Sequence, residues 1–113
     1  MPTKFPVKFY VSGHGREVVR EWLRDLDKHD RAVIGKHTLI VQRSWPVGLP
    51  LCRSLGNSLW EIRSSLPSSR IARVMFCFYD GQIVLLNGFI KKTQKTPANE
   101  IDLALARLKE ITG

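Results

Sequence analysis

The sequence is poor in acidic residues over the stretch that carries most of its unbalanced positive charge. Residues 53–95 contain only Glu61 and Asp80 as acidic side chains, against seven lysines and arginines. A two-metal nuclease needs several clustered carboxylates to hold its ions. Asp80 is better explained by the turn that Asp80-Gly81 predicts. We therefore expect no metal site and no cofactor.

Cysteines and long apolar runs are also scarce. Cys52 and Cys77 could form at most one disulfide, and because Cys77 lies in an apolar strand pattern we expect two reduced, packed thiols. No apolar run reaches the roughly 18–20 residues that a membrane-spanning helix needs. The N-terminus lacks the charged, apolar and small-residue regions of a signal peptide. These features predict a cytoplasmic protein with no membrane partner.

Several common catalytic motifs are absent. The chain has no GxGxxG, no GxSxG and no Walker loop. Its histidines, His14, His29 and His37, have no ligand-like spacing to one another or to the cysteines. We therefore interpret all three as structural.

The chain does have a basic excess, with a net charge of +8. Residues 1–52 carry nine basic and five acidic side chains, whereas residues 53–95 carry the seven basic and two acidic ones noted above. The second segment also has the alternating pattern of a β-sheet. Positive charge gathered on a sheet favours a polyanionic partner, of which nucleic acid is the first candidate.

The 113 residues predict one domain, 1–113. Apolar periodicity predicts helices over about 15–28 and 31–44, with Trp45-Pro46 ending the second. A strand is expected before these helices, at 5–11. After them the period changes from that of a helix to that of a strand, and strands are expected at 51–55, 59–65, 71–79 and 82–90. Pro6 makes the strand at 5–11 an edge strand. Thr96 as N-cap and Pro97 at the first helical position predict a last helix. The expected fold class is α+β: an N-terminal helical hairpin packed on a small antiparallel sheet, with a C-terminal helix.

Side-chain alternation divides each predicted strand into two faces. The apolar set should face the helices and consists of Trp60, Ile62, Ala72, Val74, Phe76, Phe78, Val84, Leu86 and Ile90. The opposite set contains Glu61, Arg63, Arg73, Met75, Cys77, Leu85, Asn87, Phe89 and Lys91. Lys92, Lys95 and Arg70 are expected at the rim of this second face.

The second face has the chemistry to hold a phosphodiester. Arg63 and Arg73 can bind it through bidentate forks and the lysines can act as point charges. Phe89 or Met75 could present an apolar surface to a base. Crowded cations also favour a lowered lysine pKa, which suits proton transfer. The alternative interpretation is a solvated basic face with no ligand.

The order of several segments resembles a known family. A helical hairpin and a WPxGxP loop are followed by the segments LWEIRSS, RIARVMFCFYDGQIVLLNGF and IKKTQKTP. In this order the segments are similar to those of the HigB branch of RelE/ParE-type bacterial toxins, which is often described as phage-derived. The resemblance extends over nearly the whole chain. It implies a RelE-like fold and a ribonuclease that enters the ribosome and cuts messenger RNA without metal. It also implies a cognate helix-turn-helix antitoxin encoded beside the toxin.

The resemblance also implies roles for individual residues. Arg73 matches the arginine of the family's RVxF strand, and Arg63 the arginine after Trp-Glu. The family's basic cluster matches Lys91, Lys92 and Lys95. Where relatives commonly have LLHGF, this chain has Asn87, and an amide cannot transfer a proton.

The function expected from these observations is that of a ribosome-dependent endoribonuclease toxin. Arg73 and Arg63 would stabilise charge on the phosphate, Lys91 is the first candidate for proton transfer and Glu61 a weaker base. RNA binding is expected from Lys92, Lys95, Arg70, Phe89 and Asn87. Two alternatives remain: a non-catalytic module that binds nucleic acid or antitoxin through a degenerate site, which Asn87 favours, and a ParE-like inhibitor of DNA gyrase.

Overall fold

The computed structural model describes residues 4–92 and 95–113. The elements follow one another as β1 (Val7–Phe9), α1 (Val18–Arg24), α2 (Lys28–Ser44), β2 (Cys52–Gly56), β3 (Leu59–Ser65), β4 (Ile71–Tyr79), β5 (Gln82–Lys91) and α3 (Ala98–Thr112). The predicted α+β class is confirmed. The first helix is shorter than its periodicity predicts. No helix in the described ranges is long and apolar enough to cross a membrane.

The five strands form one sheet in the order β1-β5-β4-β3-β2. Strands β2 to β5 are antiparallel neighbours, as expected. The sheet as a whole is mixed rather than antiparallel, because β1 pairs in parallel with β5. The helical hairpin lies between β1 and the other strands in the chain, and this long connection allows the parallel pairing. β1 is an edge strand, as Pro6 predicted.

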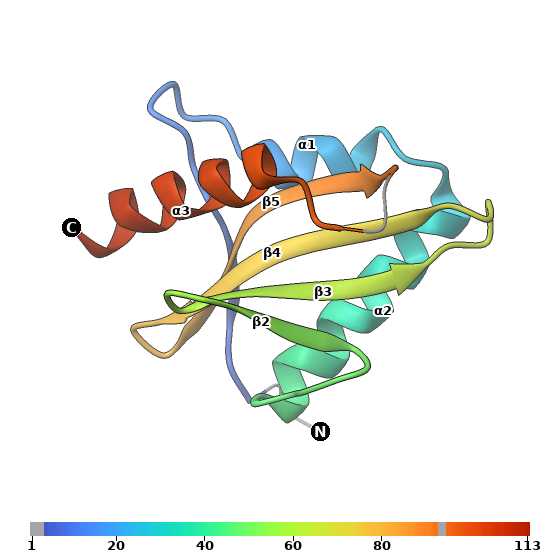
Figure 1. The fold of residues 1–113 in the computed structure, drawn as a ribbon, viewed down its shortest axis with the longest axis horizontal. Coiled ribbons are helices and arrows are strands. Elements are labelled where there is room, and N and C mark those ends of the chain that lie inside the picture. Colours follow the sequence, from blue (N-terminus) through green and yellow to red (C-terminus); the bar gives the residue numbers. More distant parts are fainter. Residues whose placement is uncertain (1–3, 93–94) are drawn as a thin grey trace.

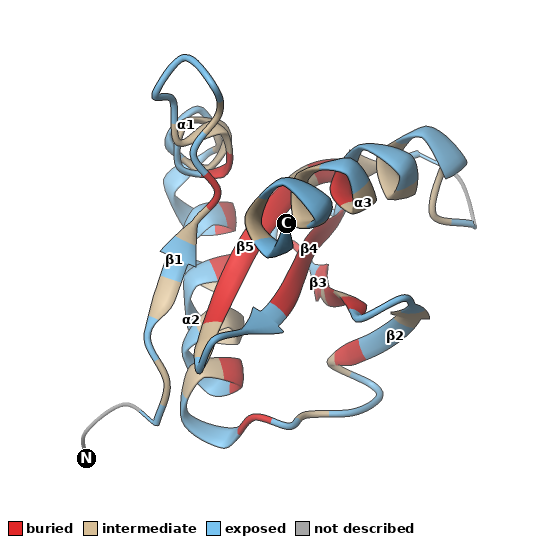
Figure 2. Ribbon diagram, turned by 90° about the vertical axis from the view of Figure 1, so that its left-hand side faces the viewer, coloured by how far each residue is buried: buried red, intermediate tan, exposed pale blue. Residues whose placement is uncertain are grey.

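Helices cover both faces of the sheet. In Figure 1, α2 runs behind the strands and α3 crosses in front of them, and Figure 2 shows the same arrangement from the side. The core beneath the hairpin includes Val19, Ile34, Val41, Ile62, Val74 and Phe76. A second core, beneath α3, includes Leu59, Met75, Cys77, Leu86 and Ala104. The face predicted to be polar is therefore partly an apolar core.

A bulge in β5 changes which of its residues face the hairpin. Phe76 pairs with Leu85 and Met75 with Asn87, so the register shifts between these pairs and Leu86 has no partner. Val84 and Leu86 consequently lie in the core under α3, and Leu85 lies under the hairpin. The predicted placement of these three side chains was wrong. One extra residue reverses the predicted alternation on the side of the bulge that precedes Asn87. The positions from Asn87 to Lys91, on the other side, keep their predicted faces.

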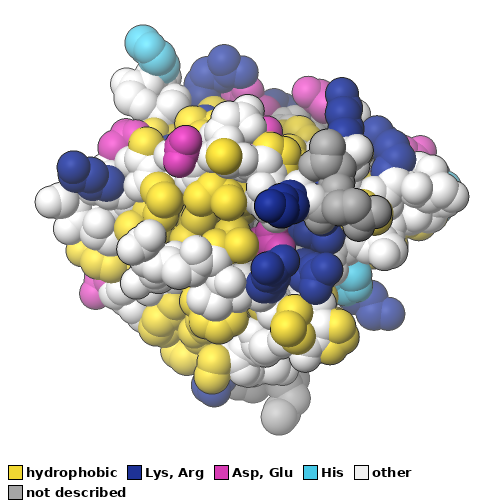
Figure 3. All heavy atoms as spheres, viewed as in Figure 1, with side chains coloured by type: hydrophobic (Ala, Val, Ile, Leu, Met, Phe, Trp, Pro, Cys, Tyr) yellow, Lys and Arg dark blue, Asp and Glu magenta, His cyan; other side chains and the backbone are white. Residues whose placement is uncertain are grey.

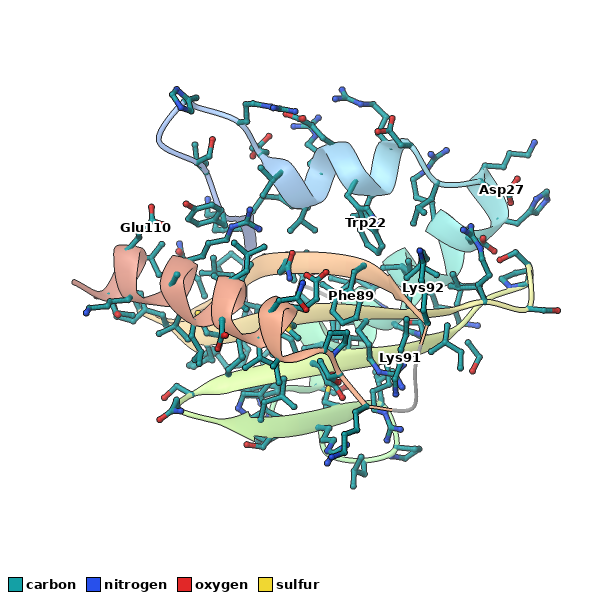
Figure 4. All side chains as sticks on the ribbon, turned by 45° about the horizontal axis from the view of Figure 1, so that its top comes forward. Trp22, Asp27, Phe89, Lys91, Lys92 and Glu110 are labelled. Carbon is teal, nitrogen blue, oxygen red and sulfur yellow. The ribbon has the colours of Figure 1, made fainter. Side chains whose placement is uncertain are left out.

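Close packing at Gly88 fixes α1 against β5. Figure 4 shows Trp22 pointing from α1 toward the sheet. A Cβ atom added at Gly88 would lie 2.5 Å from two carbons of the Trp22 ring. The absence of a side chain at Gly88 therefore allows the indole to approach the strand.

Both cysteines are free and buried, as predicted. Burial raises the pKa of the Cys52 thiol to about 12 and that of Cys77 to about 11. Both thiols are therefore protonated at neutral pH and act as small apolar groups.

Candidate functional site

Two arginines form the centre of the candidate site. Arg63 of β3 and Arg73 of β4 are directly opposite each other in the antiparallel pair. Arg73 is only 5% exposed. One of its terminal nitrogens, Nη1, donates to the carbonyl of Ala72 at 3.1 Å. The Nε atoms of Arg63 and Arg73 are both buried, and among the described residues neither has a hydrogen-bond partner. A buried donor without a partner is costly, and the guanidinium groups that carry these atoms are of the type that binds carboxylates and phosphates.

Glu61 is the acidic member of the cluster and is 1% exposed. Its Oε2 lies 3.7 Å from Nε of Arg73, an ion pair that is too long for a hydrogen bond. Its Oε1 accepts a hydrogen bond from the hydroxyl of Thr96 at 2.9 Å. Thr96 therefore does not cap α3, whose N-cap is Pro97. The segment before α3 is instead tied to the site through Glu61.

Further cations surround this pair. Arg53 of β2 is directly opposite Glu61. Burial and the positive charge of Arg73 lower the pKa of Lys91, with smaller contributions from Arg63 and Arg53, while Glu61 acts in the other direction. Burial likewise lowers the pKa of Arg73, which Glu61 partly offsets. Figure 3 shows dark-blue Lys and Arg side chains gathered around an acidic one on this face. The described residues thus form a cluster with a clear positive excess.

A hollow of about 620 Å³ opens beside the two arginines. It is lined by His37, Pro50, Leu51, Arg63, Ser64, Ser65, Ile71 and Arg73. The hollow lies where β2 parts from β3: Cys52 pairs with Ile62, and Arg63 N then donates to the carbonyl of Leu51. Beyond that point β3 is an edge, so side chains from both faces of the sheet line one space.

His37 reaches this hollow from α2. Its Nδ1 lies 2.7 Å from the hydroxyl oxygen of Ser64. Burial, with a smaller contribution from Lys36, lowers the pKa of the imidazole. The interpretation of His37 as purely structural overlooked this position, since the residue shares the hollow with Arg63 and Arg73.

Four residues of the predicted polar face are covered by α3: Met75, Cys77, Asn87 and Phe89. Met75 and Phe89 lie in the core beneath this helix and are 0% and 8% exposed. The expectation that one of them presents an open surface to a base was wrong, because α3 occupies that surface. Asn87 is also buried, and its amide donates to Oε1 of Glu100 at 2.6 Å. Asn87 therefore attaches α3 to β5.

The predicted rim residues separate into two groups. Lys92 and Lys95 are exposed, and Figure 4 shows Lys91 and Lys92 pointing in different directions from the end of β5. Arg70 instead pairs with the fully buried carboxylate of Asp30 at 3.2 Å and donates to the Ser68 hydroxyl at 3.1 Å. Its guanidinium holds the β3–β4 turn against α2, although about half of the side chain remains exposed.

Sequence reasoning missed Arg53, Thr96 and His37 as members of this site. Arg53 could have been found, because it alternates with Cys52 on a predicted strand that adjoins Glu61. Thr96 and His37 gave no local signal, since their partners are 35 and 27 residues away. In the part of the chain that the structure describes, no three His, Cys, Asp or Glu side chains form a group that could hold a metal ion.

Residues 21–109 match the model of a protein family described as "Phage derived protein Gp49-like (DUF891)". No curated protein matches the chain.

Proposed function

This chain belongs to the Gp49-like family of phage-derived proteins, a toxin-like family associated with toxin–antitoxin systems, and we propose that it is a HigB-type endoribonuclease toxin. Its substrate would be messenger RNA on the ribosome. Its partner would be a cognate helix-turn-helix antitoxin that blocks the toxin. The observation that carries the proposal is the pair of buried Nε donors on Arg63 and Arg73, unpaired among the described residues and next to a hollow.

The proposed reaction is an internal transesterification of RNA that needs no metal. The ribose 2′-hydroxyl gives its proton to a general base, and its oxygen forms a bond to the adjacent phosphorus. The bond from phosphorus to the 5′-oxygen then breaks, which leaves a cyclic phosphate and a 5′-hydroxyl. Arg63 and Arg73 stabilise the charge that develops on the non-bridging oxygens, where one positioned donor contributes about 3–4 kcal/mol.

Proton transfer and RNA binding fall to the surrounding residues. Lys91 has a lowered pKa and can give its proton to the departing oxygen more readily than an ordinary lysine. The carboxylate of Glu61 forms an ion pair with Arg73 and accepts a hydrogen bond from the Thr96 hydroxyl. Its proposed role is therefore to orient the arginine. The exposed Lys92 and Lys95 attract the RNA backbone. Phe89 and Asn87 are buried, and their burial does not favour the RNA-binding roles expected of them from the sequence.

The test is inducible expression in bacterial cells, with primer extension on a reporter mRNA. The parent chain should stop translation first and leave discrete cuts in the reporter, and co-expression of the proposed antitoxin should restore growth. Arrest of DNA replication before translation would instead support gyrase inhibition. Absence of both effects would support a non-catalytic binding module.

A further inference from the structure

The hollow contains a titratable group from the opposite face of the sheet. Apart from His37 and the two arginines, the described residues that line it are serines and apolar residues, which do not titrate near neutrality. His37 is the lining residue whose charge changes near neutral pH. It sits midway along α2, a regular helix, so its backbone is held firmly.

The contact with Ser64 orients the imidazole ring. Nδ1 lies 2.7 Å from the Ser64 hydroxyl. In the tautomer with the proton on Nδ1, the ring N–H donates a hydrogen bond to the Ser64 oxygen. Nε2 then keeps a lone pair that can accept a proton. A second group that orients the ring in this way is the usual arrangement of a histidine base.

The electrostatic surroundings favour the neutral imidazole. Burial lowers its pKa, with a smaller contribution from Lys36 on α2, and Arg63 on β3 and Arg73 on β4 line the same space. The other lining residues, from the loop before β2 and from β3 and β4, are uncharged. A ring kept neutral by burial and by Lys36 is free to accept a proton at physiological pH.

We propose that His37 is the general base of the endoribonuclease site, which it reaches around the free edge of β3. This inference rests on the proposed function. The 2′-hydroxyl gives its proton to Nε2 of His37, and the 2′-oxygen forms its bond to phosphorus. The bond to the 5′-oxygen breaks, and that oxygen takes a proton from Lys91 or from water. His37 then returns its proton to the solvent.

The first test is the pH dependence of cleavage by the purified protein on ribosomes programmed with mRNA. For the parent chain the rate should rise with pH through the pKa of His37 and level off above it. His37→Gln and His37→Asn should lower the rate by about 10²- to 10⁴-fold and remove this rise. The asparagine variant keeps an amide that can donate to Ser64, so it separates lost chemistry from lost folding. His14→Gln, in an exposed loop, is the matched control and should behave as the parent.

A second test needs no catalysis. The imidazole resonances of the parent chain are titrated by NMR with and without inorganic phosphate. Phosphate held by Arg63 and Arg73 should raise the pKa of His37, whereas added phosphate should not alter the resonances of His14, which lies in an exposed loop. The proposal is overturned if the pKa of His37 does not respond, or if both His37 variants keep the parent rate and pH profile. In that case an active parent and an inactive Arg73→Ala variant would still support the endoribonuclease. No cleavage by the parent at any pH would overturn both.

Discussion

Arg73 combines burial with an unsatisfied donor, which is unusual for a charged side chain. It is 5% exposed, it carries an Nε without a hydrogen-bond partner among the described residues, and Glu61 lies at ion-pair distance. A desolvated guanidinium interacts strongly with an anion because little water screens it. Lysine could not replace its planar fork without loss.

Replacing Arg73 should affect both chemistry and stability, because it removes a phosphate donor and leaves the buried Glu61 carboxylate without its ion-pair partner. We expect Arg73→Ala to lower mRNA cleavage by about a hundred- to a thousand-fold, the usual effect of removing one transition-state donor. Arg73→Lys should recover only part of the rate. Arg43→Ala, at an exposed position in the last turn of α2, controls for the lost charge. Circular dichroism should show a folded variant, and undiminished cleavage by Arg73→Ala would remove Arg73 from the mechanism.

Asp30 has a structural role that depends on pH. Its carboxylate is fully buried, and hydrogen bonds from Ser68 and Arg70 lower its pKa. Because the folded state binds this proton less readily than the unfolded chain, the contribution to stability is present above the unfolded pKa of about 3.9 and is lost as the pH falls through the folded pKa.

We expect Asp30→Asn to lower the melting temperature clearly at pH 7. The difference from the parent should shrink as the pH is brought down to about 3, since the parent then loses the same contribution. Thermal unfolding followed by circular dichroism measures both, with Asp102→Asn on the exposed face of α3 as the control. A difference in melting temperature that stays constant with pH would contradict the assigned pKa shift.

At the scale of elements, the contact of α1 with β5 depends on a residue without a side chain. Gly88 has an ordinary negative-φ backbone, so the requirement for glycine there comes from packing and not from backbone strain. The ring of Trp22 occupies the place of a Cβ. Tight interiors respond strongly to an added methyl group when its neighbour is a rigid ring.

We expect Gly88→Ala to destabilise the fold by about 1–3 kcal/mol, the usual cost of overpacking. The same change at Gly35, within α2, meets no atom within 4 Å and should stabilise by about 0.5–1 kcal/mol, because alanine loses less backbone entropy in a helix. Urea unfolding of the two variants gives the comparison. Adding Trp22→Leu to Gly88→Ala should recover part of the loss, and equal effects at the two glycines would exclude the steric explanation.

At the scale of the whole molecule, the positive charge is the property that acts on RNA at the longest range. The net charge of +8 attracts a polyanion from a distance, and the buried arginines act only after contact. Lys92 and Lys95 are exposed and border the cluster along the chain. Binding to RNA should therefore depend steeply on salt.

We expect the logarithm of the RNA affinity to fall linearly with the logarithm of the salt concentration. Lys92→Ala should reduce the slope by about 0.7, the value for one lost contact with single-stranded nucleic acid. Lys109→Ala, exposed in the last turn of α3, has the same change in charge and should leave the slope unaltered. Fluorescence anisotropy with a labelled RNA measures this, and equal slopes for the parent and Lys92→Ala would show that Lys92 touches no phosphate.

The sequence by itself determined the elements and much of their chemistry. Alternation placed Arg63 and Arg73 on one face, Asp80-Gly81 predicted the β4–β5 turn, and Pro6 predicted an edge strand. These features are local, since a strand's two faces and a turn's backbone angles depend on neighbouring residues.

The tertiary structure alone decided what covers each face. Packing between distant segments produces three features of the fold. These are the bulge at Leu86, the packing of α3 over Met75 and Phe89, and the parallel pairing of β1 with β5. It likewise brought His37 to the hollow beside Arg73. Such contacts carry no periodic signature in the chain, because they are selected by the free energy of the whole packed core and not by the preference of any one segment.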